Sequence, residues 1–387
     1  MPNVLLIGDT GRSTELRREV PVPILDPFRY AEVDGRRVAV VWSIEGDRIA
    51  EVDPSIEIVP VETFPYDDLQ RGGVDFYDIQ PILTVRIARA LGLRDAIVPG
   101  SFPLRHADAL RADGVALTVD QRFFDDRRRA KAPRELGAIE RASRAAEAGM
   151  AAIAALLARS EPGGGGRSVD GEPLTCERLR AAAIDVFTDH GCRGDDLIVA
   201  HGPQSAGGHD QGSGRVENDD VVLCDLFPLE IESAYFADMT RTFTVGTPAP
   251  EVVAWHADCL GALDLARSLV RPGVDGADVH RAVCDLLGER GHPTNLSVPE
   301  GTVQRDGFSH SLGHGVGLDV HESPYLGKRG HELVVGDVIT LEPGLYRKGF
   351  AGVRIEDLLV VTENGCETIT DYPYSLDPAA TEVGAPR

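Results

Sequence analysis

The chain has 387 residues, which is enough for about two domains of roughly 150 residues each, and 42% of its residues are apolar. This composition excludes an intrinsically disordered, collagen-like or small secreted scaffold class of protein. Acidic residues outnumber basic ones by 62 to 39, so the formal net charge is −23 and nucleic acid is disfavoured as a partner.

The basic residues are unusually poor in lysine. Only Lys131, Lys328 and Lys348 are lysines, and the remaining cations are arginines. An acidic surface with little lysine suits a high-salt cytoplasm, where screening removes the self-repulsion, so the chain is a candidate halophilic protein. A GC-rich genome that favours arginine is the alternative explanation.

Other features of the composition bear on the cellular compartment. The longest apolar runs, such as Val4 to Ile7, are too short to span a membrane. The N-terminus lacks the basic and long apolar regions of a signal peptide, which predicts a cytoplasmic protein without a membrane partner. The six cysteines show no CxxC spacing, and most of them are expected to be reduced core residues.

Residues 1–126 mix strand and helix patterns and predict a small α/β domain. Short apolar runs predict buried strands at Val4–Gly8, Arg37–Ile44, Ala96–Gly100 and Val115–Asp120. The segment GDTGRS, which begins at Gly8, lacks the GK[ST] ending of a phosphate-binding loop. We therefore interpret it as an ordinary turn between a strand and a loop.

Residues 127–387 contain an internal repeat. A long alanine-rich helix is predicted from Pro133 to Ala158, and a second long helix over Val252–Val270. Each is followed by a shorter helix, LRAAAIDVFTDHG ending at Gly191 and VHRAVCDLLGERG ending at Gly291. The offset of 100 residues between these two endings predicts two related halves.

Paired strands with acidic residues recur in both halves. DVVLCD ends at Asp225 and DVITLE ends at Glu342, and the strand that follows each of them begins beside Asp238 or Glu356. Any one of these acids alone would be a solvated turn residue. Two halves that face each other would bring four carboxylates together, and such a cluster needs cations to remain ionised. Oxygen ligands of this kind suit Mn²⁺, Mg²⁺ or a pair of borderline metal ions.

A histidine-rich segment forms the third element of the site. FSHSLGHGVGLDVHE carries His310, His314 and His321 among glycines, which let the backbone pass close to a ligand. Core histidines that cap local backbone are the alternative. His209 lies in a glycine-rich loop before the first pair of strands. Alone it would be a surface histidine, whereas the repeat places it on the wall of the site.

The order Asp225, Asp238, His314, Glu342, Glu356, within the motifs D-M-T-R-T-F, G-H-G-x-G-L, L-E-P-G and R-I-E-D, resembles that of the pita-bread metallopeptidases. This family includes methionine aminopeptidase, aminopeptidase P and prolidase, and the resemblance runs from about Arg127 to Ile369. It implies an α+β protein with a C-terminal pita-bread catalytic domain that contains an internal pseudo-twofold repeat. A smaller α/β creatinase-type domain is expected to precede it.

The resemblance also implies the function. Methionine aminopeptidases generally lack such an N-terminal region, so the chain is expected to be a dinuclear metal-dependent Xaa-Pro peptidase of the aminopeptidase P or prolidase type. The expected cofactors are two divalent ions, with Mn²⁺ preferred and Co²⁺ or Zn²⁺ as alternatives. The expected substrate is a short peptide with proline at the second position, and the expected assembly is a homodimer.

The metal ligands implied by the resemblance are divided between the two ions. Asp238 and Glu356 are expected to bridge them, Asp225 to complete one site, and His314 with Glu342 to complete the other.

The expected catalytic residues are His209, His310, His321, Glu342 and Arg354. Glu342 would take a proton from the attacking water, and His310 and His321 would hydrogen-bond the developing oxyanion and the flanking peptide groups. His209 would shape the pocket for proline, and Arg354 matches an arginine beside the last ligand.

One departure from the family concerns the residues after Asp225, where LFPLEIESAYF replaces the usual nearby glycine. Both acids remain, so this departure is expected to affect substrate preference rather than metal binding. Two other functions stay open. One is a non-peptidase enzyme on the same scaffold, either a creatinase-like hydrolase, which works without these ligands, or a metal-dependent lyase. The other is a catalytically inactive binding module.

Overall fold

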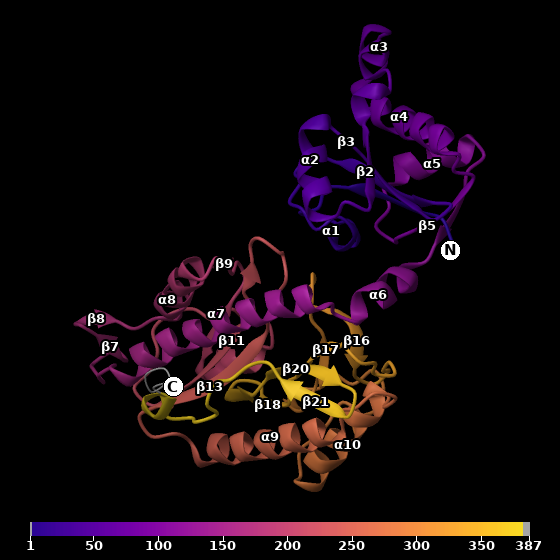
Figure 1. Ribbon diagram of the computed structural model, residues 1–387. Coiled ribbons are helices and arrows are strands. Elements are labelled where there is room, and N and C mark those ends of the chain that lie inside the picture. The colour runs from indigo at the N-terminus through magenta and orange to yellow at the C-terminus, as the bar shows by residue number, and fades with distance from the viewer. Residues whose placement is uncertain (1, 382–387) are drawn as a thin grey trace. The chain divides into compact units, whose positions relative to one another are not determined.

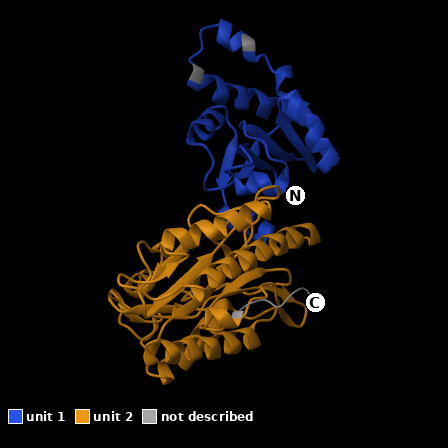
Figure 2. Ribbon diagram, turned by 90° about the vertical axis from the view of Figure 1, so that its left-hand side faces the viewer, with its two compact units in different colours: residues 1–128 blue, residues 129–387 orange. Residues whose placement is uncertain are grey.

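The computed structural model describes residues 2–381, apart from the side chains at positions 67, 76 and 381. The chain forms two compact units, residues 1–128 and 129–387 (Figure 2). The sequence placed a domain boundary after residue 126, and both positions lie within helix α6 (Gln121–Arg129). No helix among residues 2–381 is long and apolar enough to cross a membrane.

The first unit is built on a six-stranded mixed sheet in the order β4–β3–β2–β1–β5–β6. Strand β1 pairs parallel with β5, as β5 does with β6, whereas β2 runs antiparallel to both of its neighbours. The strands are β1 (Val4–Gly8), β2 (Phe28–Val33), β3 (Arg36–Val41), β4 (Ile56–Pro60), β5 (Asp95–Val98) and β6 (Ala116–Val119). The helices before α6 are α1 (Thr14–Glu19), α2 (Ser43–Val52), α3 (Tyr66–Arg71), α4 (Phe76–Leu91) and α5 (Leu104–Ala112).

The strand predicted over Arg37–Ile44 ends earlier than expected, at Val41, and α2 begins at Ser43. The backbone N–H and the hydroxyl of Ser43 both donate to the Glu62 carboxylate, at 3.0 and 2.7 Å, which holds the first turn of the helix. Ile44 is accordingly 81% exposed. The apolar run continues from β3 into the first turn of α2, so the strand predicted from the length of the run was too long.

The second unit contains four long helices. They are α7 (Pro133–Ala158), α8 (Cys176–Asp189), α9 (Pro250–Leu269) and α10 (Gly276–Glu289). The bounds of α8 and α10 differ by 100 residues at both ends, as the predicted repeat requires. The side chains of Thr175 and Asp275 cap these two helices by accepting a hydrogen bond from the first turn. Figure 1 shows α7 and α8 on one side of the strands and α9 and α10 on the other.

The strands of the second unit lie between these helix pairs. A three-stranded sheet has the order β10–β11–β13, a second has the order β14–β18–β19, and a five-stranded sheet has the order β16–β15–β17–β20–β21. The strands of the first half are β7 (Ser168–Val169), β8 (Glu172–Pro173), β9 (Cys192–Arg193), β10 (Ile198–His201), β11 (Asp220–Leu226), β12 (Leu229–Glu230) and β13 (Met239–Val245). The strands of the second half are β14 (Asp306–Gly307), β15 (Gly313–Gly315), β16 (Glu322–Leu326), β17 (Val338–Leu341), β18 (Gly344–Arg347), β19 (Ala351–Arg354), β20 (Asp357–Thr362) and β21 (Gly365–Thr368).

Each half has its own apolar core. Met150 and Phe187, on α7 and α8, pack with Phe243 of β13 in the first half. In the second half, Leu263 of α9 and Val283 of α10 belong to a core that includes strands β17 and β20. Burial of apolar side chains on both faces holds the strands in place, so the polar side chains that they carry converge between the two halves.

Candidate metal centre and active site

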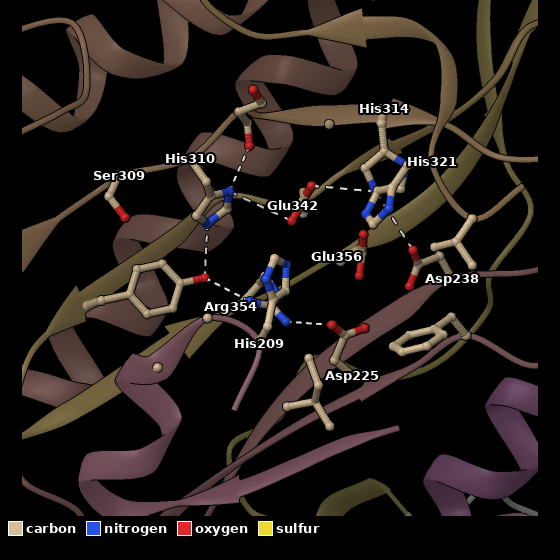
Figure 3. A pocket seen from close by; sticks show the side chains of 18 of the residues that line it. His209, Asp225, Asp238, Ser309, His310, His314, His321, Glu342, Arg354 and Glu356 are labelled. Atoms are coloured by element: carbon tan, nitrogen blue, oxygen red, sulfur yellow. Dashed lines mark hydrogen bonds and ion pairs between the residues drawn. The ribbon is translucent and has the colours of Figure 1, made fainter. Parts of the chain in front are cut away.

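A cavity of about 840 Å³ is lined by residues from both halves of the second unit (Figure 3). All nine predicted site residues line it. They are His209, Asp225, Asp238, His310, His314, His321, Glu342, Arg354 and Glu356. Residues that are more than 140 positions apart in the chain therefore share one cavity.

The register of the first pair of strands places two of the acids. Asp225 lies opposite Thr240 in the antiparallel pairing of β11 and β13. Asp238 precedes Thr240 by two residues, and side chains two residues apart on extended backbone share a face. Asp225 and Asp238 therefore point to the same side of this sheet, toward the cavity.

The second pair of strands repeats this arrangement. Leu341 lies opposite Asp357 in the pairing of β17 and β20, so Glu342, directly after β17, and Glu356, directly before β20, lie at the same end of this pair. The Glu356 N–H donates to the carbonyl oxygen of Thr240 at 3.1 Å, and the Thr240 hydroxyl donates to the Glu356 carboxylate at 2.7 Å. These two hydrogen bonds join the strands of the two halves directly at the site.

His314 lies in β15, between β16 and β17. The flanking glycines permit this position, because a Cβ atom on Gly313 would lie 2.0 Å from the Thr340 carbonyl oxygen, and one on Gly315 would lie 2.4 Å from that of Ser323. The Nδ1 atom of His314 is 3.1 Å from the carbonyl oxygen of Gly315, which only accepts. Nδ1 therefore carries the hydrogen, and Nε2 presents a lone pair to the carboxylates.

Three of the predicted ligands form a compact donor set. One ligand atom from each of Asp238, His314 and Glu356 lies within 4.8 Å of the others. The Nε2 atom of His314 is 3.8 Å from an Asp238 oxygen and 3.7 Å from a Glu342 oxygen. These separations exceed hydrogen-bond length and leave room for a cation between the groups.

The unpartnered oxygens and the raised pKa values of the carboxylates favour a bound cation. Among the described residues, Asp225 Oδ1 and Asp238 Oδ1 are buried and have no hydrogen-bond partner. Burial and the neighbouring carboxylates raise the pKa of Asp238 and Glu356 well above the usual range, and burial raises that of Glu342 to about 8. A divalent ion would satisfy the unpartnered oxygens and stabilise the ionised forms. The donor set, four carboxylates and one imidazole, fits hard or borderline divalent metals.

A hydrogen-bonded chain runs along one wall of the cavity. Arg354 Nη2 donates to an Asp225 oxygen at 2.5 Å, and Arg354 Nη1 donates to the Tyr346 hydroxyl at 3.0 Å. The Nδ1 atom of His310 is 2.7 Å from the Ser311 carbonyl oxygen, so Nδ1 donates and Nε2 accepts. The Tyr346 hydroxyl, 2.9 Å from His310 Nε2, therefore donates to His310 and accepts from Arg354.

Tyr346 is a cavity residue that the sequence analysis missed. Burial raises its pKa to about 12, so its hydroxyl stays protonated and can continue to donate. The available signal was its place on β18, four residues after the predicted ligand Glu342. A single tyrosine in a strand carries no chemical signature of its own, and only the fold brings it to His310 and Arg354.

The other two histidines face the cavity differently. The ring of His321 packs edge-on against that of His314, with 4.3 Å between centroids. Burial and the neighbouring His209 lower the pKa of His321, so its neutral ring has one nitrogen that donates and one that accepts. His209 is exposed in the loop after the turn Gly202–Gly207, and it lines the same cavity as Arg354 and Asp225 (Figure 3).

Two further motif residues hold the predicted ligand Glu356 in place and are not among the residues that line the cavity. Arg241, from D-M-T-R-T-F, is 2% exposed and donates to the Glu356 carbonyl oxygen at 2.6 Å. It also donates to the carboxylate of Asp357, from R-I-E-D, at 2.9 Å. This buried ion pair crosses from β13 to β20 and fixes the backbone on both sides of the Glu356 side chain.

Comparisons with known proteins agree with this geometry. The model of metallopeptidase family M24 matches residues 137–363. The chain is 36% identical over 183 residues to the uncharacterized peptidase YqhT of Bacillus subtilis, covering 47% of this chain and 48% of YqhT. It is 36% identical over 177 residues to the Xaa-Pro dipeptidase of Pyrococcus furiosus, covering 45% and 47%. The chain thus spans about half the length of the curated relatives it matches.

The fold extends over nearly the whole chain. The crystal structure of the X-Pro aminopeptidase of Thermotoga maritima superposes with a TM-score of 0.76 at 23% identity, covering 97% of each chain. This similarity confirms the predicted pita-bread architecture. Because the family model covers more than half of the chain, including all nine predicted site residues, the chain belongs to metallopeptidase family M24.

Proposed function

We propose that this protein is a dinuclear metal-dependent peptidase that cleaves the Xaa-Pro bond at the N-terminus of short peptides. The observation that carries the proposal is the convergence of the five predicted ligand side chains in one cavity, with two buried aspartate oxygens that lack a partner among the described residues. A cavity of about 840 Å³ is of the size that holds a small ligand.

The residues that would hold the ions are Asp225, Asp238, His314, Glu342 and Glu356. When bound, divalent ions would lower the pKa of a water molecule and polarise the scissile carbonyl. Mn²⁺ is proposed because four of the five ligands are carboxylates, with Co²⁺ and Zn²⁺ as the alternatives.

The chain's own side chains would supply the remaining chemistry. Glu342 lies on the cavity wall and would hold the proton that leaves the attacking water. His321 would donate to the developing oxyanion. Both ring nitrogens of His310 already have partners in the chain, so His310 would act with Tyr346 to position the Arg354 guanidinium beside Asp225. His209 would contact the proline side of the substrate.

The preference for proline follows from the chemistry of the bond. A bond to the proline nitrogen has no N–H, and its φ angle is fixed, so proteases that need an extended backbone donor bind it poorly. The names of the relatives, which include an Xaa-Pro dipeptidase and an X-Pro aminopeptidase, support the proposed substrate. The creatinase-type identity of the first unit, a homodimeric assembly and a cytoplasmic location are proposed with it.

The test is metal analysis combined with peptide hydrolysis by the full chain. After loading with Mn²⁺, about two ions per chain and cleavage of Ala-Pro-Ala are expected, with Ala-Ala-Ala as the matched control peptide. Asp238→Asn is expected to lose both ions, because this residue would contact both. Absence of bound metal would contradict the proposal. Two bound ions without cleavage of any Xaa-Pro peptide would instead favour a metal-dependent lyase.

A further inference from the structure

The charges on the cavity wall are strongly unbalanced. Among the described residues that line it are five carboxylates and one guanidinium, and none is a lysine. That guanidinium belongs to Arg354, which is 5% exposed and donates to Asp225, Tyr346 and Thr240. Its positive charge is therefore already committed within the protein and is not free to bind a substrate carboxylate.

Asp196 is the one carboxylate of this set that is not a predicted metal ligand. It is exposed, in the segment between β9 and β10, and its carboxylate accepts a hydrogen bond at 3.0 Å from Gln211, which also lines the cavity. Two residues after Asp196, Ile198 lies opposite Asp225 across the β10–β11 pairing. If the proposed ions offset the four ligand carboxylates, Asp196 and Arg354 carry the remaining permanent charges of this wall, and Asp196 is the exposed one.

The position of a substrate's own carboxylate depends on its length. In an Xaa-Pro dipeptide the carboxylate belongs to the proline itself, within one residue of the scissile bond, which is about 3.5 Å of chain. In a longer peptide this place holds a neutral peptide group, and the carboxylate moves outward by about 3.5 Å for each further residue. Only the dipeptide must therefore bring an anionic group into the cavity. Among the described residues that line the cavity, the one permanently charged cation is Arg354, which already pairs with Asp225.

We propose that the cavity selects peptides whose chain continues beyond the proline, and that Asp196 disfavours a free carboxylate on that proline. The inference rests on the proposed Xaa-Pro peptidase function and specifies its substrate class. A carboxylate in the binding site repels an anionic ligand and leaves the binding of a neutral ligand nearly unchanged. Asp196 is therefore a specificity-determining residue.

The experiment compares Ala-Pro, Ala-prolinamide and Ala-Pro-Ala with the metal-loaded full chain. The amide differs from the dipeptide only in the charge of its terminal group. The kcat/KM values for the amide and the tripeptide are expected to exceed that for the dipeptide by at least about tenfold. A dipeptide that is cleaved as well as its amide overturns the inference and leaves the proposed function standing. If none of the three is cleaved, both the function and the inference fail.

A pair of variants tests Asp196 itself. Asp196→Asn is expected to reduce the ratio of kcat/KM for amide over dipeptide by about two- to fivefold at low salt, and less at high salt, because an exposed charge is screened. Asp195→Asn is the matched control, since Asp195 is on the same loop, does not line the cavity and pairs with Arg193 at 3.9 Å. An unchanged ratio in Asp196→Asn, or an equal change in Asp195→Asn, overturns the role of Asp196.

Calorimetry provides a readout that does not depend on turnover. Proline and prolinamide differ by the same charge, and prolinamide is expected to bind the metal-loaded protein more tightly. Tighter binding of proline contradicts the inference.

Discussion

The ammonium group of Lys131 lies 2.8 Å from a carboxylate oxygen of Glu322, and each side chain is only 2% exposed. Glu322 directly follows His321 and begins β16, whereas Lys131 precedes α7. The other two lysines, Lys328 and Lys348, are exposed. The one buried lysine of this arginine-rich chain thus ties the start of the second unit to the segment that carries His321.

Removal of this lysine is expected to destabilise the second unit. Lys131→Met leaves the Glu322 charge buried without its partner, which typically costs about 3–5 kcal/mol. Thermal denaturation should show a clear fall in Tm for Lys131→Met. Lys348→Met, at an exposed position, serves as the control and should remain within about 0.5 kcal/mol of the parent protein. Equal Tm values for the two variants would show that the buried pair adds nothing to stability.

His321→Ala and His314→Ala are expected to fail in different ways. His321 is proposed to donate to the oxyanion, so its removal should leave metal content and Tm nearly unchanged while lowering kcat by roughly 10²–10³. KM should change much less, because that hydrogen bond strengthens mainly in the transition state. His314→Ala should lose metal affinity first. Near-normal kcat in the folded His321→Ala protein would remove its catalytic assignment.

The stability of the metal-free protein should depend on pH. The pKa of Glu342 is raised by burial from 4.5 to about 8, so the folded state binds this proton more tightly than the unfolded chain. The stabilisation is present below about pH 4.5 and is lost as the pH rises through 8. Asp238 and Glu356 shift in the same direction. His310 and His314, whose pKa values fall to about 3, act oppositely but only below about pH 6.5.

Between pH 6.5 and 8.5 the pH dependence of stability therefore comes from the carboxylates and not from His310 or His314. Over this range the Tm of the metal-free protein should fall, and Mn²⁺ should restore it most at the upper end, where the ionised carboxylates bind the ion. His201, whose pKa is raised by Asp220, also favours lower pH, but its contribution should not respond to metal. A gain in Tm from Mn²⁺ that is the same at pH 6.5 and 8.5 would contradict this account.

The acidic, lysine-poor composition predicts a response to salt. Molar KCl should raise both Tm and activity, because screening relieves the self-repulsion of a chain with a net charge of −23. Measurements from low salt to about 2 M KCl, repeated with sucrose to separate screening from solute exclusion, would check this. A flat or falling salt profile would leave genome composition as the explanation.

The sequence alone was sufficient to predict the repeat and a set of candidate ligands that share one cavity. Asp225 and Glu342 end β-rich runs, and the offset of 100 residues between two similar helix patterns places α8 and α10 correctly. The order of the motifs identifies the family. Each of these patterns can be recognised within a short stretch of chain. The fold adds contacts that such stretches do not encode. Tyr346 meets Arg354 through the pairing of β18 with β19, and it meets His310 through the segment that follows β14, which pairs with β18. Arg241 reaches Asp357 between two strands far apart in the chain.

The same distinction explains why the strand predicted to run to Ile44 ends at Val41, and why the sequence did not indicate the pair of Lys131 and Glu322. A local pattern records which side chains are apolar or charged, and this decides which segments can form strands, helices or ligand sites. Strand register, burial and the partner of a charge depend instead on segments that packing brings together from distant parts of the chain. The candidate ligands could therefore be predicted from the sequence, whereas the hydrogen bonds that orient their side chains were decided by the tertiary structure.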